Sequence, residues 1–167
     1  MHEIATKIAE RFPSAFVDAV EEFGDLVIRI RRDGVEPVCR FLHDEPDMAF
    51  DHLTTVTSID WQEDADRFEV VYQLYSIRWN RRLRVKARIP EEDCAVASVS
   101  GIWRGAAFPE REVYDLMGIR FTGHPDLRRI FLPEDYDGHP LRKDYPTEGK
   151  GWRDTFEFLP TIEPEGT

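Results

Sequence analysis

The chain has little cysteine: Cys39 and Cys94 are the two cysteines among its 167 residues. They form no Cys-x-x-Cys pair, and no histidine stands at ligand spacing from either one. An iron–sulfur cluster usually needs four thiolates, and a structural zinc needs four cysteine or histidine ligands. One copy of this chain cannot assemble either site, so both residues are interpreted as reduced thiols.

Long apolar runs are also missing. A membrane-spanning helix needs about 20 apolar residues, and even the stretch Phe68–Leu74 contains Glu69 and Gln73. The chain begins Met1-His2-Glu3 and lacks the apolar core of a signal peptide. We therefore expect no direct membrane span and a cytosolic protein, with any membrane association made through a partner.

Common motifs of catalysis and cofactor binding are absent too. There is no Gly-x-Gly-x-x-Gly, Walker loop, Gly-x-Ser-x-Gly or His-Glu-x-x-His, which excludes an obvious nucleotide, flavin, nucleophile or zinc site. Hydrophobic residues make up 41% and charged residues 33%, as in a globular domain. The net charge of −11 argues against a whole surface that binds nucleic acid or anionic lipid, but it allows a local basic patch.

The hydrophobic pattern predicts an α+β fold, with a small mixed sheet and flanking helices. Asp33 is expected to cap a helix, with Glu36 as its capping-box partner. The predicted helices lie at 4–12, 33–42, from residue 47, and at 110–116 before Gly118. The predicted strands lie at 15–23, 26–30, 54–60, 68–74 and 83–89, the last two as an antiparallel hairpin around Asn80.

A basic stretch, residues 78–88, coincides with the second strand of this hairpin. Arg82, Arg84, Lys86 and Arg88 alternate with apolar residues and therefore point to one side. The stretch is interpreted as a guarded edge strand or solvated face, as a surface for an acidic partner, or as an RNA-binding face. Binding of single strands needs aromatic residues on the charged face, and this face has none, which favours the first two.

Acidic residues gather on the helix that follows Pro109. Glu112 and Asp115 are three residues apart and share a helical face. Together with His124 they suggest the site of a metal-dependent hydrolase. Arg111 stands beside the acids, which favours a structural network of ion pairs instead.

Prolines punctuate the segment that follows Gly118, and its apolar residues keep neither the helical nor the strand period. We therefore divide the chain into an α+β domain, residues 1–118, and an extended Pro-rich C-terminal arm, residues 119–167. So long an apolar loop is unusual inside one compact domain, and a partner is expected to bury part of it. The charged residues of the arm suit contacts across an interface, or they pin the arm to its own domain.

The run EREVYDLMGIRFTGHPDLRRIFLPEDYDGHPLRKDYP, residues 110–146, resembles the signature of the 30-kDa subunit family of respiratory complex I. Bacterial members of this family are the C-type subunit of NADH-quinone oxidoreductase. FEVVYQLYSI, RLRVKARI and residues 100–107 are similar to the family as well, so the resemblance covers roughly residues 40–150. Phe108 stands where the family more often has tryptophan.

The resemblance implies a non-catalytic, cofactor-free structural subunit in the hydrophilic arm of proton-translocating NADH:quinone oxidoreductase. Such a subunit packs on the 49-kDa-type (D-type) protein near the quinone site, in a complex with B-type and I-type subunits. FMN and the iron–sulfur clusters are then expected in partner subunits. The location implied is peripheral, at the cytoplasmic face of the inner membrane.

Alternatives remain open. The chain is alternatively the equivalent subunit of a membrane-bound hydrogenase or of a ferredoxin- or F420-type dehydrogenase, or, less strongly supported, the hydrolase or RNA-binding domain above. No catalytic, cofactor-binding or metal residue is predicted. The predicted structural and partner-binding residues are Glu110, Arg111, Glu112, Asp115, His124, Asp126, Leu127, Arg128, Arg129, Phe131, Arg142, Lys143, Asp144 and Tyr145.

Overall fold

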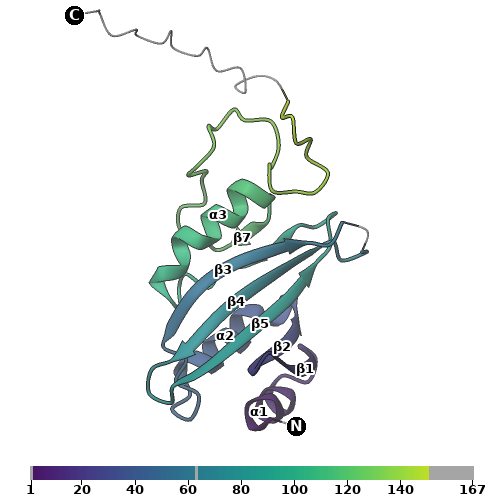
Figure 1. Ribbon diagram of the computed structural model, residues 1–167. Coiled ribbons are helices and arrows are strands. Elements are labelled where there is room, and N and C mark those ends of the chain that lie inside the picture. The colour runs from purple at the N-terminus through teal and green to yellow at the C-terminus, as the bar shows by residue number, and fades with distance from the viewer. Residues whose placement is uncertain (1, 63, 151–167) are drawn as a thin grey trace, which may run out of the picture.

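The computed structural model describes residues 2–62 and 64–150. Within them the fold is α+β, with a five-stranded mixed sheet and a separate two-stranded sheet (Figure 1). The elements are, in chain order, α1 (Glu3–Arg11), β1 (Phe16–Glu22), β2 (Asp25–Arg31), the 3-10 turn η1 (Arg32–Gly34), α2 (Val35–Asp44), β3 (His52–Asp60), β4 (Phe68–Ser76), β5 (Arg81–Ile89), β6 (Ala95–Ala97), the 3-10 turn η2 (Arg104–Ala106), α3 (Ala107–Met117) and β7 (Arg120–Thr122).

The larger sheet is assembled from two locally connected units. One is the antiparallel hairpin β1–β2, and the other is the antiparallel meander β3–β4–β5. The units meet where β2 and β5 run parallel, with Leu26 paired to Leu83. The resulting strand order is β1-β2-β5-β4-β3. The helix α2 lies in sequence between the two units and crosses one face of the sheet that they form (Figure 1).

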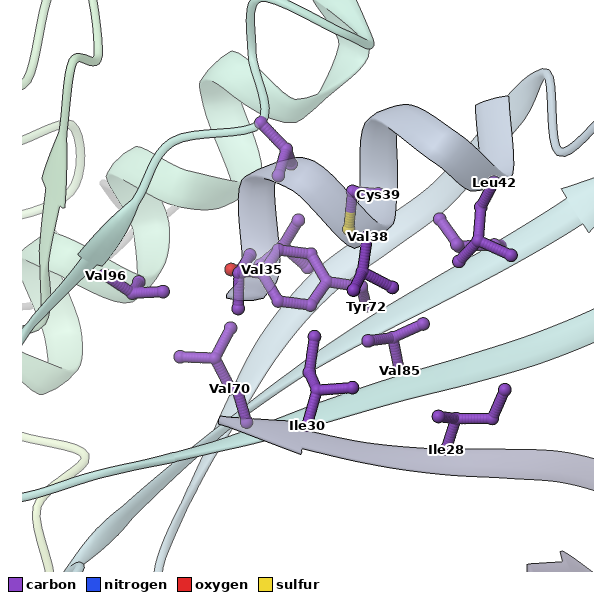
Figure 2. Packing of buried hydrophobic residues seen from close by; sticks show 14 of the residues in the cluster. Ile28, Ile30, Val35, Val38, Cys39, Leu42, Val70, Tyr72, Val85 and Val96 are labelled. Atoms are coloured by element: carbon purple, nitrogen blue, oxygen red, sulfur yellow. The ribbon is translucent and has the colours of Figure 1, made fainter. Parts of the chain in front are cut away.

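This covered face of the sheet carries the core. Ile28, Ile30, Val70, Tyr72 and Val85 point from the strands towards α2, and each is at most 2% exposed (Figure 2). The residues of α2 in this contact are Val35, Val38, Cys39 and Leu42, all fully buried. Full burial of an aliphatic side chain contributes roughly 1.5–3 kcal/mol, so this layer accounts for much of the stability of the domain.

The elements with a strong hydrophobic period are confirmed. The N-terminal helix is α1, the strands at 15–23, 26–30 and 54–60 are β1, β2 and β3, and the hairpin around Asn80 is β4–β5. The helix near Pro109 begins at Ala107 and ends before Gly118, whose φ of 77° places it in the left-handed region that closes helices.

Two local predictions are wrong. Asp33 does not cap α2, because the chain enters this helix from the 3-10 turn η1, and Gly34 takes the N-cap position without a side-chain bond. A capping box needs an extended backbone at the N-cap, which this entry does not provide. The helix expected from Asp47 is a turn, since the chain must reach β3 within a few residues of the end of α2. Phe50 still enters the core, and its N–H donates to the carbonyl of Leu42 at 3.0 Å.

The basic strand is not at an edge. β5 is the central strand of the larger sheet, so the interpretation as a guarded edge is wrong. Three of its cations pair with acids of neighbouring strands: Arg84 with Asp25 at 2.7 Å, Lys86 with Glu22 at 3.6 Å, and Arg88 with Glu69 at 3.4 Å. These ion pairs cover the sheet face opposite the core, where a central strand requires neutralisation of its charges.

The two-stranded sheet was not predicted. β6 and β7 run parallel, with Val96 paired to Phe121. β7 lies in the range assigned to the C-terminal arm, yet Ile119 and Phe121 are buried in the core. The folded domain therefore continues to Thr122. Three-residue strands carry too short a pattern for a period to be recognised.

We expect Gly34→Ala to destabilise the chain, because an added Cβ would lie 2.3 Å from the Cβ of Ala15. Overpacking of this kind costs about 1–3 kcal/mol, measurable as a lower urea midpoint of the purified chain. Gly101→Ala is the matched control, since nothing lies within 4 Å of a Cβ built there. Equal midpoints for the two variants would contradict the tight contact between η1 and the start of β1.

Candidate functional site

The C-terminal arm is the candidate site, because it is a long segment whose path no regular structure fixes. Residues 123–150, the part that the structure describes, form turns and extended stretches between the end of β7 and residue 150. Residues 151–167 of the predicted arm lie outside the described residues. The arm loops out beyond α3, at the end of the molecule opposite α1 (Figure 1). Its backbone groups need partners from elsewhere in the chain.

Asp115 is the first anchor of the arm. Its Oδ2 accepts three successive backbone N–H groups, those of Ile130, Phe131 and Leu132, at 3.0, 2.7 and 3.0 Å. Its Oδ1 accepts a hydrogen bond from Arg129 at 3.2 Å. The carboxylate is fully buried, so the arm wraps an anion in its own backbone, in the manner of an anion-binding nest.

Several forces act on this carboxylate. Burial raises the pKa of Asp115, and a negative charge in the last turn of α3 also opposes the helix dipole. The three N–H donors and the charge of Arg129 outweigh burial and hold the pKa below its ordinary value. Arg129 also donates to the carbonyl of Tyr136 at 3.2 Å, so one ion pair joins two turns of the arm to α3.

Arg67 is the second anchor. Its side chain is 6% exposed and contacts three carboxylates. Nε and Nη2 donate to both oxygens of Asp60 at 2.9 and 2.8 Å, Nη1 donates to Glu91 at 2.8 Å, and Nη2 also bonds Asp144 of the arm. The N–H of Lys143 donates to the same Asp60 at 2.9 Å. The Arg67 guanidinium accordingly holds the pKa of Asp60 and of Asp144 below their usual range.

Between the two anchors the arm lies against the end of α3. Arg142 Nε donates to the carbonyl of Met117 at 2.8 Å, and His139 Nδ1 contacts the carbonyl of Asp115 at 2.8 Å. A Cβ on Gly118 would lie 2.5 Å from Arg142 Nη2 and 2.6 Å from the His139 ring. Gly118 is thus needed both for its left-handed φ of 77° and for the room that it leaves the arm.

The start of the arm is fixed by His124 and Arg111. His124 Nδ1 accepts the N–H of Asp126 at 3.0 Å, so the opposite nitrogen, Nε2, carries the proton and donates to the carbonyl of Ala107 at 3.0 Å. Arg111 donates to the carbonyls of Arg128 and Arg129 at 3.0 and 3.2 Å. Both side chains therefore bond backbone groups of the protein itself.

Glu110 is buried in the first turn of α3, beneath the start of the arm. It accepts hydrogen bonds from Ser98 Oγ at 2.6 Å and from the N–H of Val99 at 2.7 Å. Burial raises the pKa of Glu110 to about 7, because these two bonds only partly compensate for lost water. His124 Nε2 is 3.9 Å from its Oε2.

The apolar side chains of the arm divide into two groups. Leu127 packs on the core, and Tyr145 is half-buried, with its hydroxyl 2.8 Å from that of Tyr136. Phe131 is 63% exposed and Leu141 is 59% exposed. Because the N–H groups of both residues bond α3, their backbone is held while their side chains face outward.

Most of the predicted charged residues have partners within the chain. Glu110, Arg111, Asp115, His124, Arg129, Arg142 and Asp144 contribute the contacts above, and Asp126 pairs with Arg128 at 3.0 Å on the surface. Lys143 is exposed and takes part through its N–H. Glu112 is exposed on α3 and does not join the cluster. Where intramolecular pinning and interface contacts were both open, these distances describe the pinning.

The geometry does not support the metal-dependent hydrolase. Glu112 points to solvent, while Asp115 and His124 are engaged in separate hydrogen-bond clusters. In residues 2–62 and 64–150, no group of three or more His, Cys, Asp or Glu side chains is placed to hold a metal ion. The RNA-binding face loses its basis too, because Arg84, Lys86 and Arg88 are paired with acids.

Asp60, Arg67 and Glu91 were missed by sequence reasoning. Asp60 ends β3 and Arg67 directly precedes β4, so each reads as a residue of a turn. The available signal was the hairpin itself: Asp60 pairs with Phe68 across it, which brings the neighbouring Arg67 close. The link from Arg67 to Asp144 spans most of the chain, and no local pattern contains it.

Comparison with solved structures defines the class of protein. The chain is similar to Nqo5 in its trypsin-resistant fragment (1–134), with a TM-score of 0.61, 31% identity, and coverage of 74% of this chain and 99% of that one. It is also similar to a chain of the membrane-bound sulfane sulfur reductase, an archaeal respiratory membrane complex, with a TM-score of 0.73, 26% identity, and coverage of 87% and 85%. The fold is thus that of an α+β class with a member in a respiratory membrane complex.

Sequence comparison defines the family. The model for the respiratory-chain NADH dehydrogenase 30 Kd subunit matches residues 28–151. The C-type subunit of NADH-quinone oxidoreductase from Geobacter metallireducens is 45% identical over 146 residues, 87% of this chain and 89% of that one. That of Roseiflexus sp. is 41% identical over 143 residues, 86% and 82%. The chain belongs to the 30-kDa subunit family of respiratory complex I and is a subunit of the NADH-quinone oxidoreductase complex, as the resemblance predicted. None of the helices within residues 2–62 and 64–150 is long and apolar enough to cross a membrane.

Asp115→Asn is expected to release the arm, because the amide cannot accept three N–H groups and pair with Arg129 at once. The amides of residues 130–132 should then exchange with deuterium roughly tenfold faster or more. Asp126→Asn is the control, since its carboxylate is exposed and surface pairs contribute little. Unchanged protection in Asp115→Asn would show that the anchor does not hold the arm.

Glu110 predicts a stability that falls as pH rises. Its pKa is about 7 in the folded chain, above the ordinary 4.5, so between these values the folded state binds the extra proton. The free energy of unfolding should therefore drop by about 3 kcal/mol across this window and level off above it. Urea titrations at about pH 5 and about pH 8 should show the slope in the wild type and in Glu110→Gln a flatter profile. Exposed Glu112→Gln should keep the wild-type slope, and a slope retained by both variants would refute the assignment.

Proposed function

We propose that the chain is a non-catalytic structural subunit of the hydrophilic arm of complex I, and that its C-terminal arm packs on the 49-kDa-type (D-type) protein near the quinone site. One observation carries the proposal: Phe131 and Leu141 face outward from a backbone that buried charges hold in place. Apolar side chains displayed on a pre-ordered segment lose little entropy on binding.

The charged residues of the arm have an indirect part in this proposal. Asp115, Arg129, Arg142 and Asp144 fix the path of the arm, and the apolar residues make the contact with the partner. Exposed Asp126, Arg128 and Lys143 lie on the same segment and supply the polar rim that interfaces usually have. Glu112 is exposed on the adjacent α3 and belongs to the same rim.

The electron-transfer chemistry is assigned to the partners. FMN and the iron–sulfur clusters reside in other subunits, and the B-type and I-type subunits are further neighbours in this proposal. The complex then holds the chain peripherally at the cytoplasmic face of the inner membrane. The family membership supports this division, together with the engagement of the buried titratable groups in hydrogen bonds that hold the fold.

A second candidate is the equivalent position in a related modular complex. The similarity to a chain of the membrane-bound sulfane sulfur reductase favours it. The same arm geometry would serve there, because it needs only an apolar groove on a large neighbouring subunit.

Phe131→Ser combined with Leu141→Ser should weaken incorporation into the complex, because each change removes apolar area that the partner would cover. The isolated chain should keep its urea midpoint, since both side chains are already exposed. Native gels of membranes from a strain that carries the double variant would show a loss of assembled complex of roughly tenfold or more.

Val17→Ser is the control for this experiment. Val17 is 57% exposed on β1, outside the arm, and its loss should leave assembly intact. Full assembly of the double variant would reject the arm as the docking segment. Loss of assembly with Val17→Ser as well would show that the readout reports exposed apolar residues in general.

A further inference from the structure

A second surface lies at the other end of the larger sheet from the arm. It is the connection between β4 and β5, residues 77–82, here named the basic tip. Arg78, Arg81 and Arg82 are all exposed there. Within the part of the chain that the structure describes, none of the three has a carboxylate at ion-pair distance. This part of the basic stretch is not used by the contacts of the fold.

The unpaired state of the tip stands out against the rest of the protein. The chain carries a net charge of −11, and the next cations along β5, Arg84, Lys86 and Arg88, each have an acidic partner. Acids are therefore plentiful, yet the fold places none of them against the tip. The tip is a local positive field on an acidic protein, which steers association with negative partners.

The tip is also rigid. The guanidinium groups of Arg78 and Arg81 lie 5.0 and 5.7 Å from the centre of the Trp79 ring. The indole N–H of Trp79 donates to the carbonyl of Pro46 at 3.2 Å, and the N–H of Ile77 donates to Asp51 at 3.1 Å. Cation–π contacts and these hydrogen bonds hold the arginines in place before any partner arrives.

Apolar groups border the cations. Ile77 is 65% exposed, Trp79 is 40% exposed, and Phe23 in the neighbouring β1–β2 turn is fully exposed. The parallel pairing of β2 with β5 puts this turn beside the tip. A cleft of ≈ 440 Å³ lies between them, lined by residues that include Gly24 and Arg81. Tryptophan and arginine are the residue types most enriched at the energetic centres of protein interfaces.

We propose that the basic tip is a second docking surface, which binds a carboxylate-rich polypeptide segment of another protein in the complex. The arginines would pair with carboxylates, and Ile77 and Phe23 would contact apolar side chains next to them. A protein partner is favoured over a membrane surface. Three arginines contribute only about 1 kcal/mol each at anionic lipid, and the acidic remainder of the chain is repelled by it.

The test places the photo-crosslinking residue p-benzoylphenylalanine at position 77 in the assembled complex. We expect an adduct with one defined peptide of another subunit, and at least two Asp or Glu residues close to the crosslinked position. Arg78→Glu with Arg81→Glu should reduce this adduct roughly tenfold or more. Arg11→Glu with Arg104→Glu changes the net charge equally at two other exposed arginines and should leave the adduct intact.

Three outcomes would overturn the proposal. They are the absence of any protein adduct at position 77, an adduct with a peptide that lacks acidic residues, and an adduct that survives both charge reversals. The lipid alternative is checked with the purified full chain and vesicles of phosphatidylcholine with anionic phosphatidylglycerol. Sedimentation with these vesicles that is lost only in the tip variant would assign the tip to lipid and contradict a protein partner.

Discussion

The path of the C-terminal arm depends on the carboxylate of Asp115. A buried anion must be surrounded by donors, and α3 has no free N–H to offer near its end. The donors come from the arm, as three successive N–H groups and one guanidinium. The requirement of one side chain thus sets the turn at residues 129–132. Arg67 imposes the reverse constraint, because a buried cation collects Asp60, Glu91 and the arm residue Asp144. Between the two anchors, the side chains that the domain does not need are turned outward.

Regular elements were readable from the sequence where a period repeats often enough. The hairpin β4–β5 and the helix α1 show their patterns over many residues, and Gly118 marks the end of α3 through its freedom at positive φ. β6 and β7 escaped because three residues contain no period. The entry into α2 escaped because a 3-10 turn before the helix cannot be told from a cap by residue type alone.

Strand order and charge pairing lay beyond local reasoning for a different reason. The parallel contact of β2 with β5 joins residues such as Leu26 and Leu83, and only the finished sheet shows that the basic strand is central. Similarly, the charges of the arm were visible in the sequence, but their partners were not. Asp144 bonds Arg67 from far along the chain, whereas Arg128 bonds only a near neighbour. Residue type told which side chains would be costly to bury, and distance decided which of them were.

The parallel contact between β2 and β5 also bears on synthesis. The hairpin β1–β2 leaves the ribosome as a finished local unit, but the free side of β2 cannot be paired until β5 has followed. Long-range strand pairing is slow, and an open strand invites pairing with other chains in the meantime. Deletion of β5 by premature termination would leave this side open permanently. Truncated chains that end before residue 81 should therefore be substrates for chaperones or proteases, whereas chains that end after residue 122 retain a closed sheet.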